Sequence, residues 1–533
     1  MKEYLGAASE AMKRSDPPTI RVLPRFVASS FFVLALTYIC YTLILVYPSH
    51  SYTEHLRRPF IPSLQPLNKT LGHTNHLQNP KPETSNETQL HHVFFGIAAS
   101  AKLWEHRKDY IKTWWRPDEA RGFVWLDKPV KRDAEGDKAL PPVKISGDTA
   151  RFKYSHRKGD RSAIRISRIV SETVRLGVEG VRWIVLGDDD TVFVLDNLIR
   201  VLRKYDHNQF YYIGSSSESH IQNIQFSCNM AYGGGGFAIS YALAKALAKM
   251  QDQCIQRYPE LYGSDDRIQA CMTELGVPLT KEIGFHQFDV HGNVFGLLAA
   301  HPIAPLVSIH HLDLIDPIFP NVNQVQALQR LKVPTKLDSA ALMQQSVCYD
   351  KSKNWTVSVS WGYTVQIFRG LIPARLVERP ARTFRNWYPN ADHVAFEFNS
   401  RPVSNDVCQR PLLYMLSNAL YNPSTNQTAS EYVRFDKARY PRCKGKEADP
   451  SRIQKVDVLK KRNPNMWDKV NLISTSLIDG CSFCREIMIV RLMLTLNCHT
   501  RYLEPLLVQQ VYFKLRSELV KMQSYEHGNA RPD

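Results

Sequence analysis

The chain has 533 residues, of which 44% are hydrophobic and 22% are charged, and its 68 Lys and Arg against 51 Asp and Glu give a net charge of +17. This composition excludes a disordered or collagen-like chain, and ten cysteines in so long a chain exclude a small disulfide scaffold. The length exceeds what one hydrophobic core usually organises, so two or three domains are expected.

The first element expected from the N-terminus is a membrane anchor. The 22 residues from Phe26 to Tyr47 carry no charge, close to the roughly 20 that span a bilayer as a helix. Basic residues gather before this segment, so residues 1–25 are predicted to stay in the cytosol and the rest of the chain to face a lumen. A buried core helix is the alternative. In the lumenal topology, the positive charge favours anionic ligands or glycans as partners and excludes nucleic acid.

Residues 48–91 are rich in Pro, Asn, Thr and His, which is typical of a stalk. Residues 92–320 alternate short apolar runs with helical periodicity and predict an α/β domain with a largely parallel sheet. Residues 321–465 favour strands and predict a smaller β-rich domain, whereas residues 466–533 have a weak pattern and no assigned role. Strands of the α/β domain are predicted at Val93–Ala99, Gly122–Leu126, Trp183–Leu186, Tyr211–Ile213 and Leu306–Ile309.

Three consecutive acids, Asp188, Asp189 and Asp190, follow the predicted buried strand that begins at Trp183. Ligands of open α/β sheets bind at strand ends, and three adjacent carboxylates repel one another unless a cation or hydrogen-bond donors compensate them. A divalent metal that also grips a diphosphate is therefore the favoured interpretation, and an acidic surface turn is the alternative.

Two further segments could complete a site. Four glycines from Gly233 to Gly236 precede a helical run, and they would let a ligand approach the backbone closely. Asp265 and Asp266 lie in a polar turn, where either could be a general base or a helix cap. Cys254 and Cys271 flank this turn and could form a disulfide in an oxidising lumen.

Five histidines follow the second acidic turn, and imidazole suits transition ions such as Mn²⁺ better than Ca²⁺. One of them could complete a metal shell with the aspartates. A histidine flanked by apolar residues is, however, more often a buried core residue whose ring nitrogens have hydrogen-bond partners. The five histidines are His286, His291, His301, His310 and His311.

The ordered motifs GDDD, YGGGGFAIS, GSDDR and GFHQF make residues 92–320 resemble the Fringe-like glycosyltransferases of family 31. The greatest likeness is to the plant Fringe-like group that contains a domain of unknown function, and it continues to about residue 465. The resemblance implies a type II Golgi membrane glycoprotein with a GT-A fold that binds a UDP-sugar, holds Mn²⁺ through its DxD motif and inverts the anomeric carbon. The implied activity is transfer of a hexose or N-acetylhexosamine to a glycan or glycoprotein hydroxyl, through a β-1,3 linkage.

The resemblance also assigns roles to individual residues. It implies Asp190, Asp188 and His286 as metal ligands, with His310 or His311 as substitutes for the histidine. Asp266, or else Asp265, would be the base. The donor-binding residues would be Asp188, Asp189, Arg107, Asp127, Gly234 and Gly235.

Two other functions remain open. The GDDDTV segment also fits the nucleophile motif of haloacid-dehalogenase-like phosphatases, but that motif usually lies near the start of its domain. A membrane-anchored lectin-like or scaffold protein without turnover is the second alternative, although such relatives often lose the acids that are retained here.

Overall fold

The computed structural model describes residues 87–131, 135–435, 443 and 449–467, with residues 37–38 and the backbone of short strands between 489 and 516. Residues 1–83 and 84–533 form two separate units, and the elements below belong to the second. The predicted span at 26–47 and stalk at 48–91 lie almost wholly outside the described residues. Among the residues that are described, no helix has both the length and the apolar character needed to cross a bilayer.

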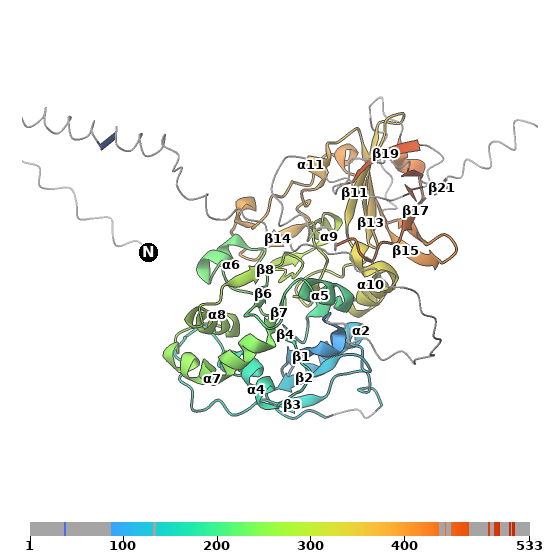
Figure 1. Ribbon diagram of the computed structural model, residues 1–533. Helices are drawn as coiled ribbons and strands as arrows, with labels where there is room; N and C mark the ends of the chain where they lie inside the picture. The colour runs from blue at the N-terminus through green and yellow to red at the C-terminus, as the bar shows by residue number, and fades with distance from the viewer. Residues whose placement is uncertain are drawn as a thin grey trace, which may run out of the picture. The chain divides into compact units, whose positions relative to one another are not determined.

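Seven strands form the first sheet: β1 (Val93–Ala98), β2 (Arg121–Leu126), β3 (Val143–Ile145), β4 (Trp183–Asp188), β6 (Tyr212–Gly214), β7 (Phe237–Ser240) and β8 (Leu279–Lys281). Their spatial order is β3-β2-β1-β4-β7-β6-β8 (Figure 1). The strand β1 pairs in parallel with both β2 and β4, and only β7 runs antiparallel to its neighbours. The prediction of an α/β fold with a largely parallel sheet is confirmed.

Helices cover both faces of this sheet, because alternate residues of its strands are apolar on opposite sides. Phe94 and Ile184 face a cluster that includes side chains of α3 (Ser162–Ser167), α4 (Ile169–Arg175), α7 (Tyr241–Arg257) and α8 (Ser264–Glu274). Phe95 and Val185 face the opposite cluster, which includes α2 (Trp104–Trp114), α5 (Leu195–Leu202) and α10 (Gln324–Asp338) (Figure 1). The predicted cystine between Cys254 and Cys271 joins α7 to α8.

The second sheet is antiparallel and confirms the β-rich texture predicted beyond residue 321. Its described strands are β11 (Gln345–Asp350), β12 (Trp355–Ser360), β13 (Thr364–Arg369), β15 (Leu412–Asn422), β16 (Gln427–Arg434) and β17 (Lys455–Lys461). Four short strands beyond residue 465 extend it: β18 (Ile489–Val490), β19 (Thr495–Thr500), β20 (Val511–Tyr512) and β21 (Lys514–Arg516). Part of the weakly patterned segment 466–533 therefore pairs with the β-rich region.

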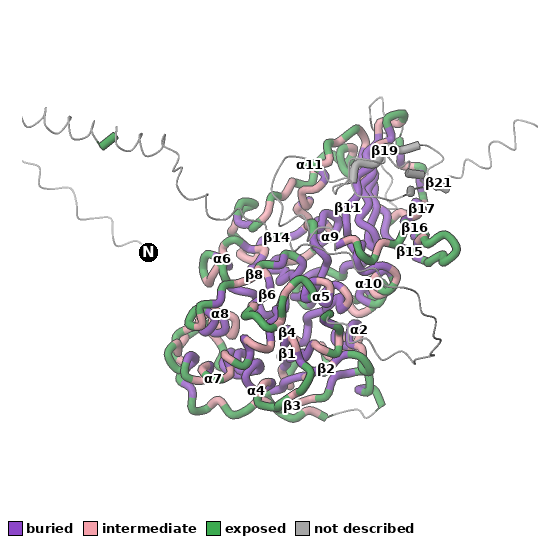
Figure 2. Tube along the Cα trace, in the orientation of Figure 1, coloured by how far each residue is buried: buried purple, intermediate pink, exposed green. Residues whose placement is uncertain are grey.

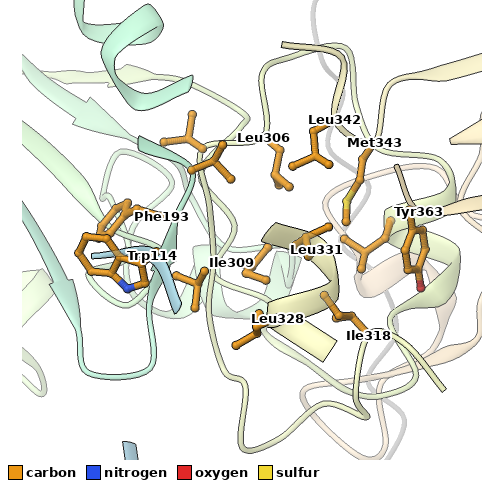
Figure 3. Packing of buried hydrophobic residues seen from close by; sticks show 14 of the residues in the cluster. Trp114, Phe193, Leu306, Ile309, Ile318, Leu328, Leu331, Leu342, Met343 and Tyr363 are labelled. Carbon is orange, nitrogen blue, oxygen red and sulfur yellow. The ribbon is translucent and has the colours of Figure 1, made fainter. Parts of the chain in front are cut away.

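One hydrophobic cluster joins the two sheets. In Figure 3, Leu328 and Leu331 of α10 lie between Phe193 of the first region and Tyr363 of the second. Buried segments run continuously through both sheets, and exposed segments lie at loops and on outer helices (Figure 2). Because the two regions share a core, elements of the second can support side chains of the first.

Short elements connect these layers around the site. The predicted strand at Leu306–Ile309 forms β10 (Ser308–Ile309), which pairs with β5 (Val192–Phe193) outside the main sheet. The strand β9 (Val290–Gly292) pairs antiparallel with β14 (Phe384–Asn386) from the second region. Three short helices complete the described α-helices: α6 (His220–Gln225), α9 (Phe295–Ala299) and α11 (Ala374–Val377).

Candidate active site

The acidic turn lies at the carboxyl end of β4, where an open α/β sheet places its ligands. Asp188 is the last residue of β4 and is paired in register with Ala98 at the end of β1. The turn is closed by Thr191, whose N–H donates to the Asp188 carbonyl at 3.0 Å and whose hydroxyl accepts from the Asp188 N–H at 2.7 Å. Asp189 and Asp190 are buried within this turn, whereas the side chain of Asp188 keeps 37% of its surface exposed.

Arg107 on α2 compensates two of these carboxylates. Its Nη1 donates to Asp189 at 2.9 Å and to Asp190 at 3.2 Å, and its Nε donates to Asp313 at 2.7 Å. Burial alone would lower the pKa of Arg107, but the charges of Asp190 and Asp189 outweigh burial and raise it. The family resemblance implied that Arg107 lies near the nucleotide, and in the structure its guanidinium contacts the acidic turn from α2.

His310, just after β10, supplies the second compensating charge. Its Nε2 lies 3.1 Å from Asp190 and 3.7 Å from Asp188, and its Nδ1 lies 3.3 Å from the carbonyl oxygen of Gln287. Burial opposes protonation of this ring, yet the charge of Asp190 raises the pKa of His310 to about 9. The Asp190 carboxyl is also buried, and His310 holds its pKa below the usual range.

Asp188 is the least compensated acid of the turn. Partial burial, together with the charges of Asp190 and Asp265, raises the pKa of Asp188 to about 7 despite the opposing charge of His310. A carboxyl in this state gains most from an added cation, because the cation would restore its charged form. Within this turn, Asp190 is therefore held charged by its neighbours, whereas Asp188 lacks a full counter-charge.

Asp188, Asp190 and His310 could hold a metal ion, since one ligand atom from each lies within 4.8 Å of the other two. Two carboxylates and one imidazole suit Mn²⁺ or a similar divalent transition ion. The Nδ1 of His310 faces a backbone carbonyl, the arrangement that commonly orients a metal-binding histidine and leaves Nε2 for the ion. The donor set therefore fits the divalent cation that the motifs imply.

The glycine run connects this group to the second acidic turn. A Cβ on Gly233 would lie 2.4 Å from the Asp265 carboxylate, and a Cβ on Gly234 would lie 2.0 Å from the His310 ring. Neighbouring Cα atoms are only about 3.8 Å apart, so Asp265 and His310 flank adjacent backbone units. Gly235 donates its N–H to the Gln287 side chain at 2.6 Å. Glycine is thus needed at Gly233 and Gly234 because Asp265 and His310 pack directly against the backbone there. The glycine run thereby lies between the metal-binding group and the second acidic turn.

Asp265 and Asp266 have different surroundings at the start of α8. Asp266 accepts from the backbone N–H groups of Tyr262 at 2.7 Å and Gly263 at 3.0 Å, so it caps the chain entering the helix. Asp265 accepts from the Gly233 N–H at 2.9 Å and from the Ser264 hydroxyl at 3.0 Å. Burial raises the pKa of both carboxyls. Asp265 is the member of the pair that faces the metal-binding group.

His286 does not join the metal-binding group. Its Nδ1 lies 3.1 Å from Glu218 and its Nε2 lies 2.9 Å from the Nε2 of His301, beside a cavity of about 350 Å³. The adjacent residue, Gln287, directs its side chain to Gly235 instead. The side chain of His286 therefore contacts Glu218 and His301, whereas that of Gln287 contacts the glycine run. The histidine beside the aspartates is His310, the substitute considered from the sequence.

Asp127, also expected near the nucleotide, lies just beyond β2 at the same sheet edge. Its side chain is exposed and accepts from the Ala101 N–H at 2.8 Å. The structure therefore brings together Asp188, Asp189, Asp190, Arg107, His310, Asp265 and Gly233 to Gly235, and it leaves Asp127 at the rim and His286 outside.

Two buried groups of the site were missed in the sequence. Asp289, which is 1% exposed, accepts from the Ser217 hydroxyl and lies 3.3 Å from the Nδ1 of His311. Burial raises the pKa of Asp289 to about 7. Arg165 donates to the carbonyl oxygens of Ala99 and Trp125, each at 3.0 Å, at the ends of β1 and β2. Asp289 follows the GFHQF motif directly, a signal that could have drawn attention to it.

Family comparisons agree with the motifs. Residues 88–310 match the family model described as Fringe-like, and residues 222–474 match the model described as "Protein of unknown function, DUF604". The two matches overlap between residues 222 and 310, the part that holds the glycine run, Asp265 and His310. The resemblance to Fringe-like proteins predicted from the sequence is confirmed.

Solved structures give weaker likenesses. The galactosyltransferase LgtC in complex with donor and acceptor sugar analogues is similar at a TM-score of 0.30 with 13% identity, over 45% of this chain and 95% of that one. An active-site mutant of LgtC gives a TM-score of 0.31 with 12% identity, over 44% and 93%. Mouse xyloside xylosyltransferase 1 gives 0.24 with 8% identity, over 35% and 82%. No curated protein matches the chain.

Proposed function

We propose that this chain, which carries a Fringe-like domain over residues 88–310, is a glycosyltransferase with a GT-A-type nucleotide-sugar site. It transfers a hexose or N-acetylhexosamine from a UDP-sugar to a hydroxyl group of a glycan or glycoprotein, with inversion and through a β-1,3 linkage. The observation that carries the proposal is the group of Asp188, Asp190 and His310 at the carboxyl end of β4, with Asp265 on the adjoining glycine backbone.

The metal-binding group accounts for the donor half of the reaction. Asp188, Asp190 and His310 would hold the divalent cation, which when bound supplies positive charge to the diphosphate of the leaving group. Arg107 keeps Asp189 and Asp190 in place through its two hydrogen bonds. The buried charges are thereby fixed before substrate binds, so little reorganisation is needed during transfer.

Asp265 accounts for the acceptor half. In its charged form it accepts the proton of the attacking acceptor hydroxyl, and its oxygens are already oriented by the Gly233 N–H and the Ser264 hydroxyl. Inversion requires a base on the acceptor side rather than an enzyme nucleophile. Asp266 is less suited to this role, because it caps the chain entering α8, whereas Asp265 faces the metal-binding group across the glycine run.

The topology expected from the sequence completes the proposal. Residues 26–47 would anchor the enzyme in the Golgi membrane as a single-pass type II protein, with the Fringe-like domain in the lumen. That compartment supplies both nucleotide sugars and glycoprotein acceptors.

The test is a panel of UDP-sugars incubated with the full-length protein and scored for Mn²⁺-dependent hydrolysis or transfer. We expect turnover of one hexose or N-acetylhexosamine donor, abolished in Asp190→Asn with the fold retained by circular dichroism. Binding of glycans without turnover of any donor would favour the lectin-like alternative. Phosphate release from a simple ester, with a trapped phosphoaspartate, would favour the phosphatase.

A further inference from the structure

Trp387 connects the second region to the metal-binding group. It directly follows β14, whose antiparallel pairing with β9 matches Asn386 with Val290 and Arg385 with His291. This pairing brings a residue of the second region beside the turn that carries His310 and His311. The indole is partly buried there.

The indole of Trp387 lies between two imidazole rings. Its ring centroid is 5.0 Å from that of His291 with an interplanar angle of 7°, and 4.8 Å from that of His311 with an angle of 10°. Three nearly parallel rings in contact form one rigid stack. The stack has one member on β9, one after β14 and one next to the metal-binding histidine.

The His311 backbone needs such support. Its φ is +54°, in the left-handed region that residues other than glycine rarely adopt and that surrounding contacts must hold in place. The Nδ1 of His311 lies 3.1 Å from the Phe288 carbonyl oxygen and 3.3 Å from Asp289. These polar contacts fix one edge of the ring, and the Trp387 indole covers one of its faces.

The conformation of His311 determines where His310 points, because the two residues share a peptide unit. His310 directs its Nε2 to Asp190 and its Nδ1 to the Gln287 carbonyl oxygen. A rotation of the His311 backbone out of the left-handed region would turn that peptide and move the His310 ring. The position of the third ligand therefore depends on the stack.

We propose that Trp387 is a positioning residue for the metal-binding group: by stacking on His311 it holds His310 in line with Asp188 and Asp190. The inference rests on the proposed function only in taking these three residues as metal ligands. It makes the β-rich region beyond residue 321 a structural part of the active site rather than an appended domain.

The test measures Mn²⁺ affinity of the full-length protein by electron paramagnetic resonance, independently of turnover. We expect Trp387→Ala to weaken the affinity roughly tenfold, the lower end of what loss of a residue behind the ligands costs. Trp387→Phe keeps an aromatic face and should retain most of the affinity. Tyr388→Phe is the matched control, since it removes only the hydroxyl bonded to Gln222 and Gln225 on α6.

A double-mutant cycle separates positioning from general destabilisation. If the stack acts through His311, the Trp387→Ala and His311→Ala variants weaken Mn²⁺ binding, and the double variant is no weaker than the worse single one. Additive losses, or an unchanged affinity in Trp387→Ala, would overturn the inference. Should Trp387→Ala fail to fold, Trp387→Leu fills the space without an aromatic face and replaces it in the cycle.

The Asp190→Asn variant distinguishes failure of this inference from failure of the proposed function. Loss of Mn²⁺ binding in Asp190→Asn with full binding in the Trp387 variants refutes only the positioning role. Retained binding in Asp190→Asn refutes the metal-binding group, and with it both proposals.

Discussion

The turn after β4 and the turn that begins α8 both present adjacent carboxylates, but the protein compensates them in different ways. In the first turn the compensation is ionic, from Arg107 and His310, and it reaches across more than 80 residues of sequence. In the second turn the donors are uncharged: backbone N–H groups within four residues for Asp266, and the Gly233 N–H and the Ser264 hydroxyl for Asp265. The ion pairs of the first turn hold the carboxylates where a cation could bind, whereas the backbone hydrogen bonds to Asp266 stabilise the start of α8.

Each turn divides its acids between structure and chemistry. In the first turn Asp190 is held by Arg107 and His310, whereas Asp188 is more exposed and has a raised pKa. In the second turn Asp266 caps the chain entering α8, whereas Asp265 contacts the Gly233 N–H. Asp265 and His310 flank the glycine run. The comparison teaches that neighbouring carboxylates of one motif can have unrelated roles, which substitutions should separate.

The largest expected effect is on turnover in Asp265→Asn. The amide keeps a hydrogen-bond acceptor for the Gly233 N–H but cannot take a proton, so kcat should fall about 10²- to 10⁴-fold. The measurement is donor transfer at saturating UDP-sugar, with Mn²⁺ affinity determined in parallel. Mn²⁺ affinity should change little. Undiminished kcat in this variant would remove Asp265 from the reaction and return the role to Asp266.

A smaller effect, on Mn²⁺ affinity, should distinguish His310 from His286 as the metal ligand. His310→Ala removes one of three ligands and should weaken Mn²⁺ binding by at least about tenfold, as measured by electron paramagnetic resonance. His286→Ala is the matched comparison, because its ring contacts Glu218 and His301 instead. The reverse ranking would restore the ligand that the family resemblance favoured.

The pH dependence of Mn²⁺ binding tests further whether His310 is a metal ligand. Since the pKa of His310 is about 9 in the metal-free protein, Mn²⁺ must displace a proton at lower pH. Affinity should therefore rise with pH, by up to tenfold per unit between about 7 and 9. Below about 7 the rise should be steeper, because Asp188 also titrates there. In His310→Ala the contribution of His310 to this slope should be lost, while Asp188, without the opposing charge of His310, should titrate at a higher pH. A flat wild-type profile would argue against His310 as a ligand.

Much of this site could be predicted from the sequence because its parts lie on regular elements. The apolar run ending at Asp188 fixes those acids at a strand end, and the glycines mark a close approach whatever the partner. The choice of histidine could not be predicted, since it depends on which of several segments brings its ring beside Asp190 in the folded chain. Sequence spacing also does not reveal that Arg107 reaches Asp189, or that Trp387 reaches His311.

The smallest expected effect concerns the cap at α8. Asp266→Ala leaves the N–H groups of Tyr262 and Gly263 without their acceptor and should lower the free energy of unfolding by about 1 kcal/mol. Urea denaturation measures this loss, and Asp265→Asn, which leaves both of those bonds intact, is its control. Because the cap sets where α8 begins, a poorly capped helix would let Asp265 shift relative to Gly233. A modest loss of kcat should then accompany the loss of stability and be smaller than in Asp265→Asn. If Asp266→Ala instead abolished turnover at unchanged stability, the division of labour within this pair would be reversed.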